Sequence, residues 1–313
     1  ARSRMGRKVI LDLDPGVSDA VALCLALFDP RIELVAVTAT GGNVNPQQAT
    51  RNVQALIEQL DPPRWPRVGA ADPEQLLVTD GREFWGEDGL CGAMFPVADL
   101  HHPHSAVKLL SDEIKSAPGE ITLVAGGPLS NIAAAFRREP DLASQIGHLM
   151  IVGGTLAGPG NVTPAAEFNI YCDAEAARAV FLAPVTKTLL PLDSSSKVVL
   201  RYDALDRLPA ASTRLGRVLR TILPGAFLAS HQRLGIEGLA VPEAVAIAAI
   251  LYPELVTTER LYCDVELSGE LTRGATVIDR RRASPHRPNM DVIVDIQPEA
   301  TVDCILRGLQ QGS

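Results

Sequence analysis

Short apolar runs rich in β-branched residues alternate with helical patterns along the first part of the chain. The expected strands lie at 8–13, 33–40, 121–125, 148–152 and 185–190, and the expected helices at 18–28, 46–59, 129–137 and 173–182. Strands that are apolar throughout are buried on both faces, and strands joined through helices run parallel. The sequence therefore predicts an α/β fold: an open, mainly parallel central sheet with helices on both faces.

The pattern changes in the last third of the chain. Residues 202–231 are expected to be mainly helical, and 243–251 to form a very apolar, buried helix. Three short runs near the C-terminus predict a small extra β element, with antiparallel pairing as one option, at 262–267, 275–279 and 291–296. No linker rich in Pro, Gly or Ser divides the sequence, so a single domain over 1–313 is expected. Long loops at 71–94 and 283–289 are expected to border a functional site.

The overall charge and the cysteines limit the partners of the chain. Its 313 residues carry a formal net charge of -8, which argues against nucleic acid or an anionic membrane as a partner. A transmembrane helix is not expected, because no apolar run of about 18 residues occurs. The five cysteines are widely spaced and form no CxxC pair, which predicts free thiols in a reducing cytosol. A small molecule in the cytoplasm is the expected partner.

The first expected strand runs directly into an acidic turn, from Asp12 to Asp19. Asp12 and Asp14 alternate along a strand and so point the same way, and Pro15-Gly16 turns the chain back before Asp19. Three carboxylates this close repel each other unless a cation or a proton lies between them. Hard oxygen ligands suit calcium or magnesium. The simpler alternative is a helix cap with acidic residues in the first turn.

A strand that ends in Asp-x-Asp is also typical of haloacid-dehalogenase-like phosphotransferases. There the first aspartate is the nucleophile, which would be Asp12 in this chain. Those enzymes also use a later lysine and paired acids, and here Pro15 follows Asp14 and no such pair follows a strand. A phosphotransferase is therefore the minor hypothesis.

Further polar segments follow other expected strands, and together with the acidic turn they resemble a known family. They are Thr40-Gly41-Gly42-Asn43-Val44, Gly127-Pro128-Leu129-Ser130-Asn131 and the run from Gly160 to Tyr171 that contains Ala166-Glu167-Phe168-Asn169. The order of these segments, their spacing and the residues in them resemble the inosine-uridine-preferring nucleoside hydrolase family. The resemblance covers almost the whole chain.

The resemblance implies one tightly bound Ca²⁺ at the bottom of a pocket. By position, its ligands would be the carboxylates of Asp14, Asp19 and Glu243 and a backbone carbonyl at Ser130. Calcium would lower the pKa of a water, and Asp14 would accept the proton as general base. The water would then attack the N-glycosidic bond of a ribonucleoside or a related N-riboside through an oxocarbenium-like state.

The resemblance also implies a set of substrate contacts and an assembly. Asn161, Glu167 and Asn169 would bind sugar hydroxyls, and Asn43 would lie near the same pocket. Each asparagine taken singly is equally typical of a turn or a cap. Members of the family are usually dimers or tetramers, so a homodimer or homotetramer is expected.

The chain departs from the family pattern at functional positions. Ser18 stands where the family carries an aspartate that holds a ribose hydroxyl. A serine hydroxyl can still make one hydrogen bond there, but it carries no charge. Pro242-Glu243 stands where the family has His-Asp, so the carboxylate has a longer stem and the proton-donating histidine is absent. Trp85 replaces another histidine and would either stack on a base or pack in its loop.

These departures leave two points open. His231 is the candidate acid for the leaving base by region, although a surface position is the commoner role of a lone helical histidine. A nucleoside- or sugar-binding relative with weak or no turnover is the alternative function.

Overall fold

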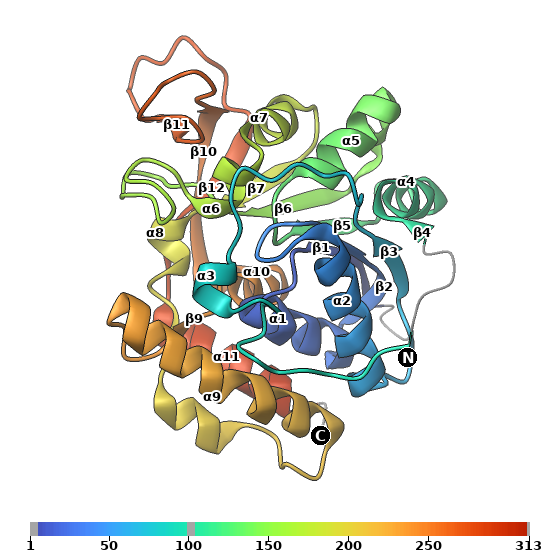
Figure 1. Ribbon diagram of the computed structural model, residues 1–313. Coiled ribbons are helices and arrows are strands. Elements are labelled where there is room, and N and C mark those ends of the chain that lie inside the picture. The colour runs from blue at the N-terminus through green and yellow to red at the C-terminus, as the bar shows by residue number, and fades with distance from the viewer. Residues whose placement is uncertain (1–5, 99–103, 312–313) are drawn as a thin grey trace.

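The structure is a computed structural model that describes residues 6–98 and 104–311 (Figure 1). Its main sheet has the order β11-β10-β12-β7-β6-β5-β1-β2-β3-β4. The strands are β1 (Arg7–Leu13), β2 (Ile32–Ala39), β3 (Arg67–Ala70), β4 (His104–Ser105), β5 (Thr122–Ala125), β6 (His148–Val152), β7 (Lys187–Leu190), β10 (Val256–Val265), β11 (Thr276–Asp279) and β12 (Met290–Ile296). A second, two-stranded sheet pairs β8 (Val199–Leu200) with β9 (Leu239–Ala240).

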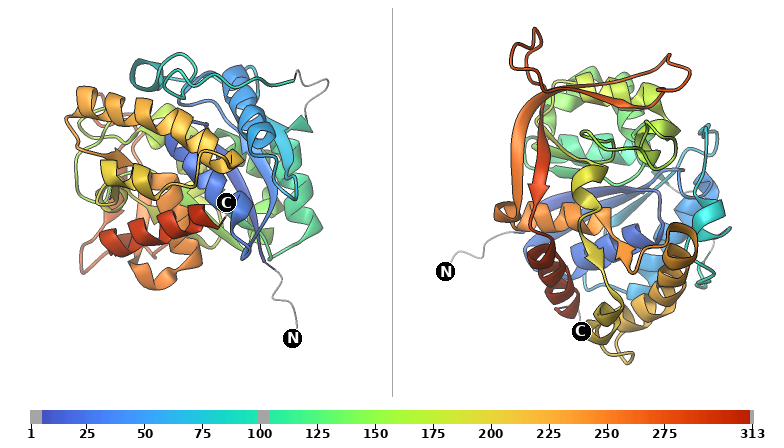
Figure 2. Two further views of the ribbon diagram at one scale, coloured as in Figure 1. Left: turned by 90° about the horizontal axis from the view of Figure 1, so that it is seen from below. Right: turned by 90° about the vertical axis from the view of Figure 1, so that its left-hand side faces the viewer.

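Helices cover both faces of the main sheet, as Figure 2 shows. One buried apolar cluster joins a face of the sheet to α1 (Val17–Phe28), α2 (Pro46–Leu60), α9 (Arg214–Leu234), α10 (Pro242–Leu251) and α11 (Pro298–Gln310). A second cluster joins the other face to α4 (Ala106–Ser116), α5 (Ser130–Arg138) and α7 (Ala174–Leu182). The shorter helices are α3 (Arg82–Trp85), α6 (Phe168–Cys172) and α8 (Leu192–Ser195), with 3-10 turns at Pro140–Gln145, Tyr202–Arg207 and Pro253–Leu255.

The order of the strands places a crevice at the end of β1. β1 lies between β2 and β5 and is parallel to both, although β3 and β4 separate β2 from β5 in the chain. Strand order therefore reverses beside β1, and open α/β sheets bind ligands at such a point, beyond the carboxyl ends of the strands. Asp12 pairs in register with Thr38 on one side and with Ala125 on the other. The segments after β1, β2 and β5 thus meet at one place.

The helix α10 is buried almost all round, because alanine, valine and isoleucine fill its length. A helix that is apolar on every side belongs inside a protein. It packs against α1. This contact brings the first turns of the two helices, and with them Ser18 and Glu243, together.

The predicted mainly parallel α/β fold is confirmed. Near the C-terminus, β10 is antiparallel to β11 and to β12, which was the expected option, and β12 is parallel to β7, so the small extra β element continues the main sheet. The mainly helical stretch expected over 202–231 consists of a 3-10 turn and α9. In the part of the chain that the structure describes, no helix has the length and apolarity needed to cross a membrane.

Candidate active site

Asp14 follows β1 and is fixed by the turn after β2. Its side chain is only 1% exposed. The backbone N–H of Asn43 donates to Asp14 Oδ2 over 2.8 Å, and Asn43 Nδ2 donates to the Asp14 carbonyl over 3.0 Å. Asn43 therefore positions Asp14, and its predicted contact with substrate stays a prediction.

Two glycines let the neighbouring turns approach the carboxylates. A Cβ on Gly42 would lie 2.1 Å from Asp14 Oδ2. A Cβ on Gly126 would lie 2.8 Å from Glu243 Cγ and 3.3 Å from Asp19 Oδ1. Side chains do not fit at these distances, so close approach requires glycine at both positions. Gly126 also shows that Asp19 and Glu243 flank the same point of the turn after β5.

Asp19 lies in the first turn of α1 and is 2% exposed. Its Oδ2 accepts a hydrogen bond from the Gly16 backbone N–H over 3.0 Å, so it does cap the helix. Its Oδ1 is buried and has no hydrogen-bond partner among the described residues. Buried carboxylate oxygens are normally paired, and a free one points to a missing cation, water or proton.

Glu243 opens α10 behind Pro242 and is 6% exposed. Its Oε2 accepts a hydrogen bond from Ser18 Oγ. Burial and then the charge of Glu243 raise the pKa of Asp14, and burial and then the charge of Asp14 raise the pKa of Asp19. The pKa of Glu243 is raised by burial and then by Asp19. The negative charges of the three carboxylates thus repel one another, and a bound cation would offset that repulsion.

The donor chemistry of this cluster fits a hard cation. Three buried carboxylates, one of which carries an unpaired oxygen, are ligands that calcium or magnesium accepts. Within residues 6–98 and 104–311, however, no three His, Cys, Asp or Glu side chains converge as a complete metal-binding group. The Ser18 hydrogen bond holds one oxygen of Glu243, so backbone or water oxygens would have to complete the shell.

The inosine-uridine-preferring nucleoside hydrolase family model matches residues 9–303. The chain belongs to this family. Pyrimidine-specific ribonucleoside hydrolase RihA of Salmonella agona (strain SL483) is 34% identical over 313 residues, which is 98% of this chain and 99% of the relative. RihA of Shigella flexneri serotype 5b (strain 8401) is 33% identical over 307 residues, 96% of this chain and 97% of the relative.

Solved structures agree with the family assignment. The purine-preferring ribonucleoside hydrolase from Gardnerella vaginalis superposes with a TM-score of 0.88 at 28% identity, over 96% of this chain and 98% of the other. A plant nucleoside hydrolase, PpNRh1, gives a TM-score of 0.87 at 27% identity, over 97% of this chain and 99% of the other. The activity of the chain is accordingly hydrolysis of the N-glycosidic bond of a nucleoside.

Asp12 is the residue that a phosphotransferase would use as its nucleophile. It is 0% exposed, and its Oδ1 accepts hydrogen bonds from Thr38 Oγ1 over 2.6 Å and from Asn131 Nδ2 over 2.8 Å. Burial raises its pKa from the ordinary value of 3.8 to about 6. Its Oδ1 ties β1 to β2 and α5, and its Oδ2 is buried without a hydrogen-bond partner among the described residues. With the chain in a hydrolase family, the minor phosphotransferase hypothesis gains no support.

The residues expected to bind the nucleoside hydrolase's sugar have structural partners here. Glu167 caps α6, accepting from the backbone N–H groups of Gly154, Asn169 and Ile170 over 2.8, 3.1 and 3.2 Å. Asn169 Nδ2 donates to the carbonyl of Gly126 over 2.8 Å and so ties α6 to the turn beside the carboxylates. Asn161 Oδ1, on the loop before α6, accepts from the backbone N–H of Phe168 over 2.8 Å. Direct sugar contacts for these three residues stay a prediction.

Gln75 belongs to this site, and no sequence signal singled it out. It lies in the loop 71–94, which borders the site as expected. Gln75 Oε1 accepts from the backbone N–H of Gly41 over 2.7 Å, and Gln75 Nε2 donates to Ser130 Oγ over 3.2 Å. Ser130 Oγ in turn donates to Asp173 Oδ2 over 2.7 Å, and Asp173 caps α7 as expected. Gln75 thus links the turn after β2 to the first residue of α5.

Two predicted residues lie outside the carboxylate cluster. Trp85 is half-buried, packs on the core beside α9 and meets Phe84 edge to face with ring centroids 4.4 Å apart. His231 is 51% exposed in the last turns of α9, and its Nδ1 lies 3.0 Å from Glu237 Oε1. His231 is thus an exposed residue beside Glu237, and its role as a leaving-group acid stays a prediction.

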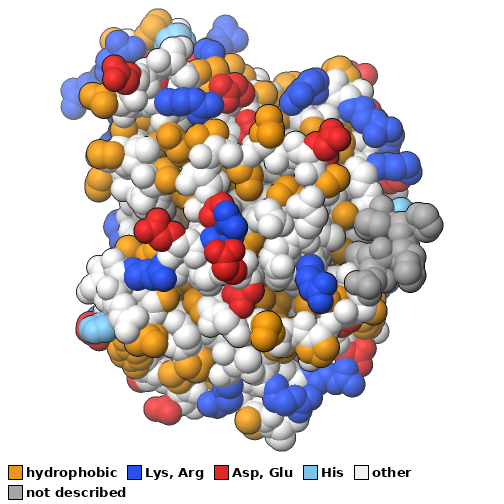
Figure 3. All heavy atoms as spheres, in the orientation of Figure 1, with side chains coloured by type: hydrophobic (Ala, Val, Ile, Leu, Met, Phe, Trp, Pro, Cys, Tyr) orange, Lys and Arg blue, Asp and Glu red, His pale blue; other side chains and the backbone are white. Residues whose placement is uncertain are grey.

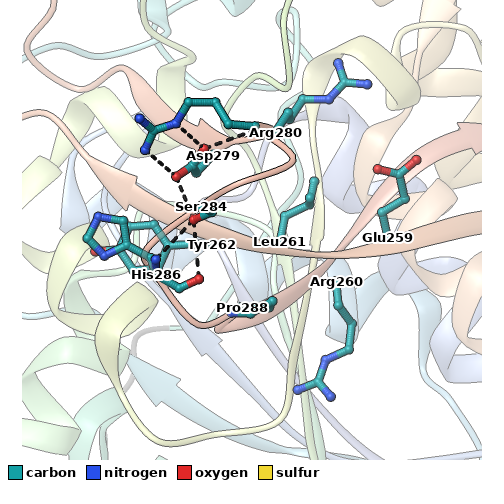
Figure 4. Close-up of a pocket in the computed structure, with 10 residues that line it drawn as sticks. Glu259, Arg260, Leu261, Tyr262, Asp279, Arg280, Ser284, His286 and Pro288 are labelled. Carbon is teal, nitrogen blue, oxygen red and sulfur yellow. Dashed lines mark hydrogen bonds and ion pairs between the residues drawn. The ribbon is translucent and has the colours of Figure 1, made fainter.

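The second long loop, 283–289, borders another pocket, which Figure 4 shows between β10 and the chain after β11. Tyr262 and His286 stack there with ring centroids 4.3 Å apart, and Ser284 Oγ donates to Asp279. None of the described residues lining this pocket is a predicted site residue.

On the face shown in Figure 3, basic and acidic side chains are interspersed and do not form a broad positive surface.

Proposed function

We propose that the chain is a calcium-dependent hydrolase of pyrimidine ribonucleosides or related N-ribosides. The observation that carries the proposal is the buried cluster of Asp14, Asp19 and Glu243 at the end of β1, with an unpaired oxygen on Asp19. The pyrimidine preference rests on the Salmonella and Shigella relatives, which match at 34% and 33% identity along almost their whole length.

The proposed ligands of the ion are the carboxylates of Asp14, Asp19 and Glu243 and the backbone carbonyl of Ser130. Calcium accepts irregular shells of oxygen ligands, which suits a cluster that is incomplete in side chains alone. Bound calcium would offset the mutual repulsion of the carboxylates and lower the pKa of a water in the site.

Asp14 is the proposed general base. The Asn43 backbone N–H holds its Oδ2, so the carboxylate is fixed in place beside the proposed ion site. A positioned base contributes about 10²–10⁴ to a rate. Water that loses a proton to Asp14 would attack the anomeric carbon as the sugar takes on oxocarbenium character.

The proposed sugar contacts are Asn161, Glu167 and Asn169, on the loop and helix that follow β6. Burial raises the pKa of Glu167. Its oxygens already accept backbone hydrogen bonds, so a sugar hydroxyl would be an additional donor to them. The nucleoside base is proposed to lie near the loop 71–94, where Trp85 would contact it. No leaving-group acid is assigned, because His231 is exposed and paired with Glu237.

A nucleoside panel tests the proposal. Uridine, cytidine, inosine and adenosine are each incubated with the chain, and released reducing sugar is measured before and after calcium is removed with a chelator and then restored. We expect pyrimidine nucleosides to be hydrolysed fastest, with activity lost on removal and regained with calcium. Turnover that survives complete calcium removal contradicts the metal assignment, and calorimetric binding without turnover favours the binding-protein alternative.

We also propose a cytoplasmic homodimer or homotetramer. The five cysteines are all unpaired, as a reducing compartment requires. Sedimentation equilibrium checks the assembly, and a monomer at every concentration contradicts it. Cell fractionation checks the compartment.

A further inference from the structure

The hydrogen bond between Ser18 and Glu243 joins two elements that are distant in the chain. Ser18 lies in the first turn of α1, Glu243 lies in the first turn of α10, and the two helices pack together. Ser18 Oγ donates to Glu243 Oε2, and Glu243 is buried while Ser18 is partly buried. The hydroxyl proton of Ser18 is therefore committed to the carboxylate.

The long side chain of Glu243 needs such a restraint. Fixing a glutamate costs more rotamer entropy than fixing a shorter acid, because it has one more rotatable bond. The backbone at Gly126 lies close to the Glu243 side chain, since a Cβ there would lie 2.8 Å from Glu243 Cγ. Among the described residues, Ser18 supplies the side-chain hydrogen bond that fixes the carboxylate end. One oxygen of Glu243 is thereby oriented toward α1.

The charges around Glu243 are those of other acids. Asp19 and Glu167 act on Glu243, and Glu243 acts in turn on Asp14. A hydroxyl at position 18 orients Glu243 without adding charge, whereas an aspartate there would set one more acid directly against it. Serine at 18 and glutamate at 243 are therefore matched to each other.

We propose that Ser18 is a positioning residue that orients Glu243 toward the cation site of Asp14 and Asp19, so that Ser18 and Glu243 act as one unit. The inference rests on the proposed calcium site and adds to it a role for Ser18 that is separate from substrate binding. Because Ser18 donates its proton to Glu243, it acts toward a sugar hydroxyl only as an acceptor.

Calorimetric titration of calcium into the metal-stripped full chain tests the proposal. The variants are Ser18→Ala, Glu243→Gln and the double substitution, which together form a double-mutant cycle. We expect Ser18→Ala to weaken calcium binding about 10-fold, within the range known for partners that orient metal ligands. In the Glu243→Gln background, the same substitution should change the affinity by less than about 3-fold, because the group that Ser18 orients has lost its charge.

Two further variants separate positioning from general structure. Ser18→Thr keeps a hydroxyl and should restore calcium affinity to near the unsubstituted value. Ser284→Ala removes an equivalent hydroxyl-to-carboxylate bond, to Asp279 in the distant pocket of Figure 4, and should leave calcium affinity unchanged. Circular dichroism melts of the stripped proteins confirm that each variant is folded before titration.

The outcomes are distinct. Unchanged or tighter calcium binding in Ser18→Ala overturns the inference, and so does an equal loss in the presence and absence of the Glu243 carboxylate. In both cases the calcium site itself stands. Failure of the unsubstituted chain to bind calcium overturns the proposed function and this inference together.

Discussion

At the scale of single residues, hydrogen-bond partners and neighbouring charges give equally buried carboxylates different roles. Asp12 Oδ1 accepts hydrogen bonds from Thr38 of β2 and from Asn131 of α5, and so ties these two elements to β1. Asp14 and Asp19 are as deeply buried, yet they face the turns after β2 and β5, where Asp19 keeps an unpaired oxygen. Neighbouring charge, more than residue type, therefore decides which aspartate serves the chemistry.

Asp14→Asn should reduce kcat for uridine by about 10²–10⁴, because the amide cannot accept the proton from water. The substitution preserves shape, so the folded state should persist. Steady-state release of reducing sugar measures the effect, and Asp112→Asn on the exposed surface of α4 is the matched control. A variant of Asp14 that keeps full kcat contradicts its role as base.

The free energy of unfolding of the metal-free chain should fall as the pH rises, because Asp12 loses its proton. Its pKa is raised by folding, from 3.8 to about 6, so the folded state binds the proton more tightly. The stabilisation is complete below pH 3.8 and is lost between there and about pH 6, a loss on the order of 3 kcal/mol. Asp12→Asn keeps an acceptor for Thr38 and removes the titration.

Urea unfolding in the presence of chelator, at pH 4.5 and at pH 6.5, measures this effect. The free energy of unfolding should fall more steeply with pH in the unsubstituted chain than in Asp12→Asn. Equal pH dependence of the two proteins contradicts the assigned pKa shift.

At the scale of elements, turns after parallel strands build the site, and helix starts supply its acids. The turn after β2 presents Gly42 and Asn43 to Asp14, and the turn after β5 presents Gly126 to Asp19 and Glu243. The packing of α1 on α10 then sets the distance between the last two acids. A change in any of these turns should therefore act on the chemistry without touching an acid.

Gly42→Ala should reduce kcat at least about 100-fold, because its Cβ would lie 2.1 Å from Asp14 Oδ2 and must displace that carboxylate. Gly119→Ala is the control, because its Cβ meets nothing within 4 Å although its φ is +75°. The control should lose about 1 kcal/mol of stability through backbone strain alone and retain full kcat. Comparable kcat losses in both variants would show that Gly42 matters only for general stability.

The sequence predicts elements and acids better than it predicts their partners. The spacing of apolar residues and the Asp-x-Asp-Pro-Gly turn predict the positions of β1 and α1 and put Asp14 between them, because these are local signals. Gln75 lies in a loop with no periodicity, and its link to Gly41 and Ser130 exists only after folding. Glu167 caps α6 through local hydrogen bonds from Asn169 and Ile170, but its further bond from the Gly154 backbone N–H joins residues 13 apart, and the spacing of the sequence does not reveal it.

At the scale of the whole molecule, repulsion within the carboxylate cluster destabilises the folded chain, and a bound cation would offset it. The chain carries a net charge of -8 and concentrates three acids at one buried point. A ligand that binds only the folded state stabilises it, by about 2.7 kcal/mol at a concentration 100 times its Kd. Cation binding, folding and activity are therefore expected to be linked in this protein.

Calcium should raise the melting temperature of the stripped chain progressively with concentration, as measured by differential scanning fluorimetry. In the Asp14→Asn/Asp19→Asn variant, the rise should be absent, because both ligands and their repulsion are gone. A calcium-dependent rise of the same size in that variant would place the stabilising ion elsewhere.

The central claim is that Asp14 and Asp19 hold a calcium ion at the end of β1. Anomalous diffraction from crystals of the chain grown with calcium tests this claim most directly. We predict one anomalous peak with carboxylate oxygens of both aspartates at about 2.3–2.6 Å. A chain that hydrolyses nucleosides in the same buffer but shows no peak there, or a peak bound only by other residues, contradicts the account.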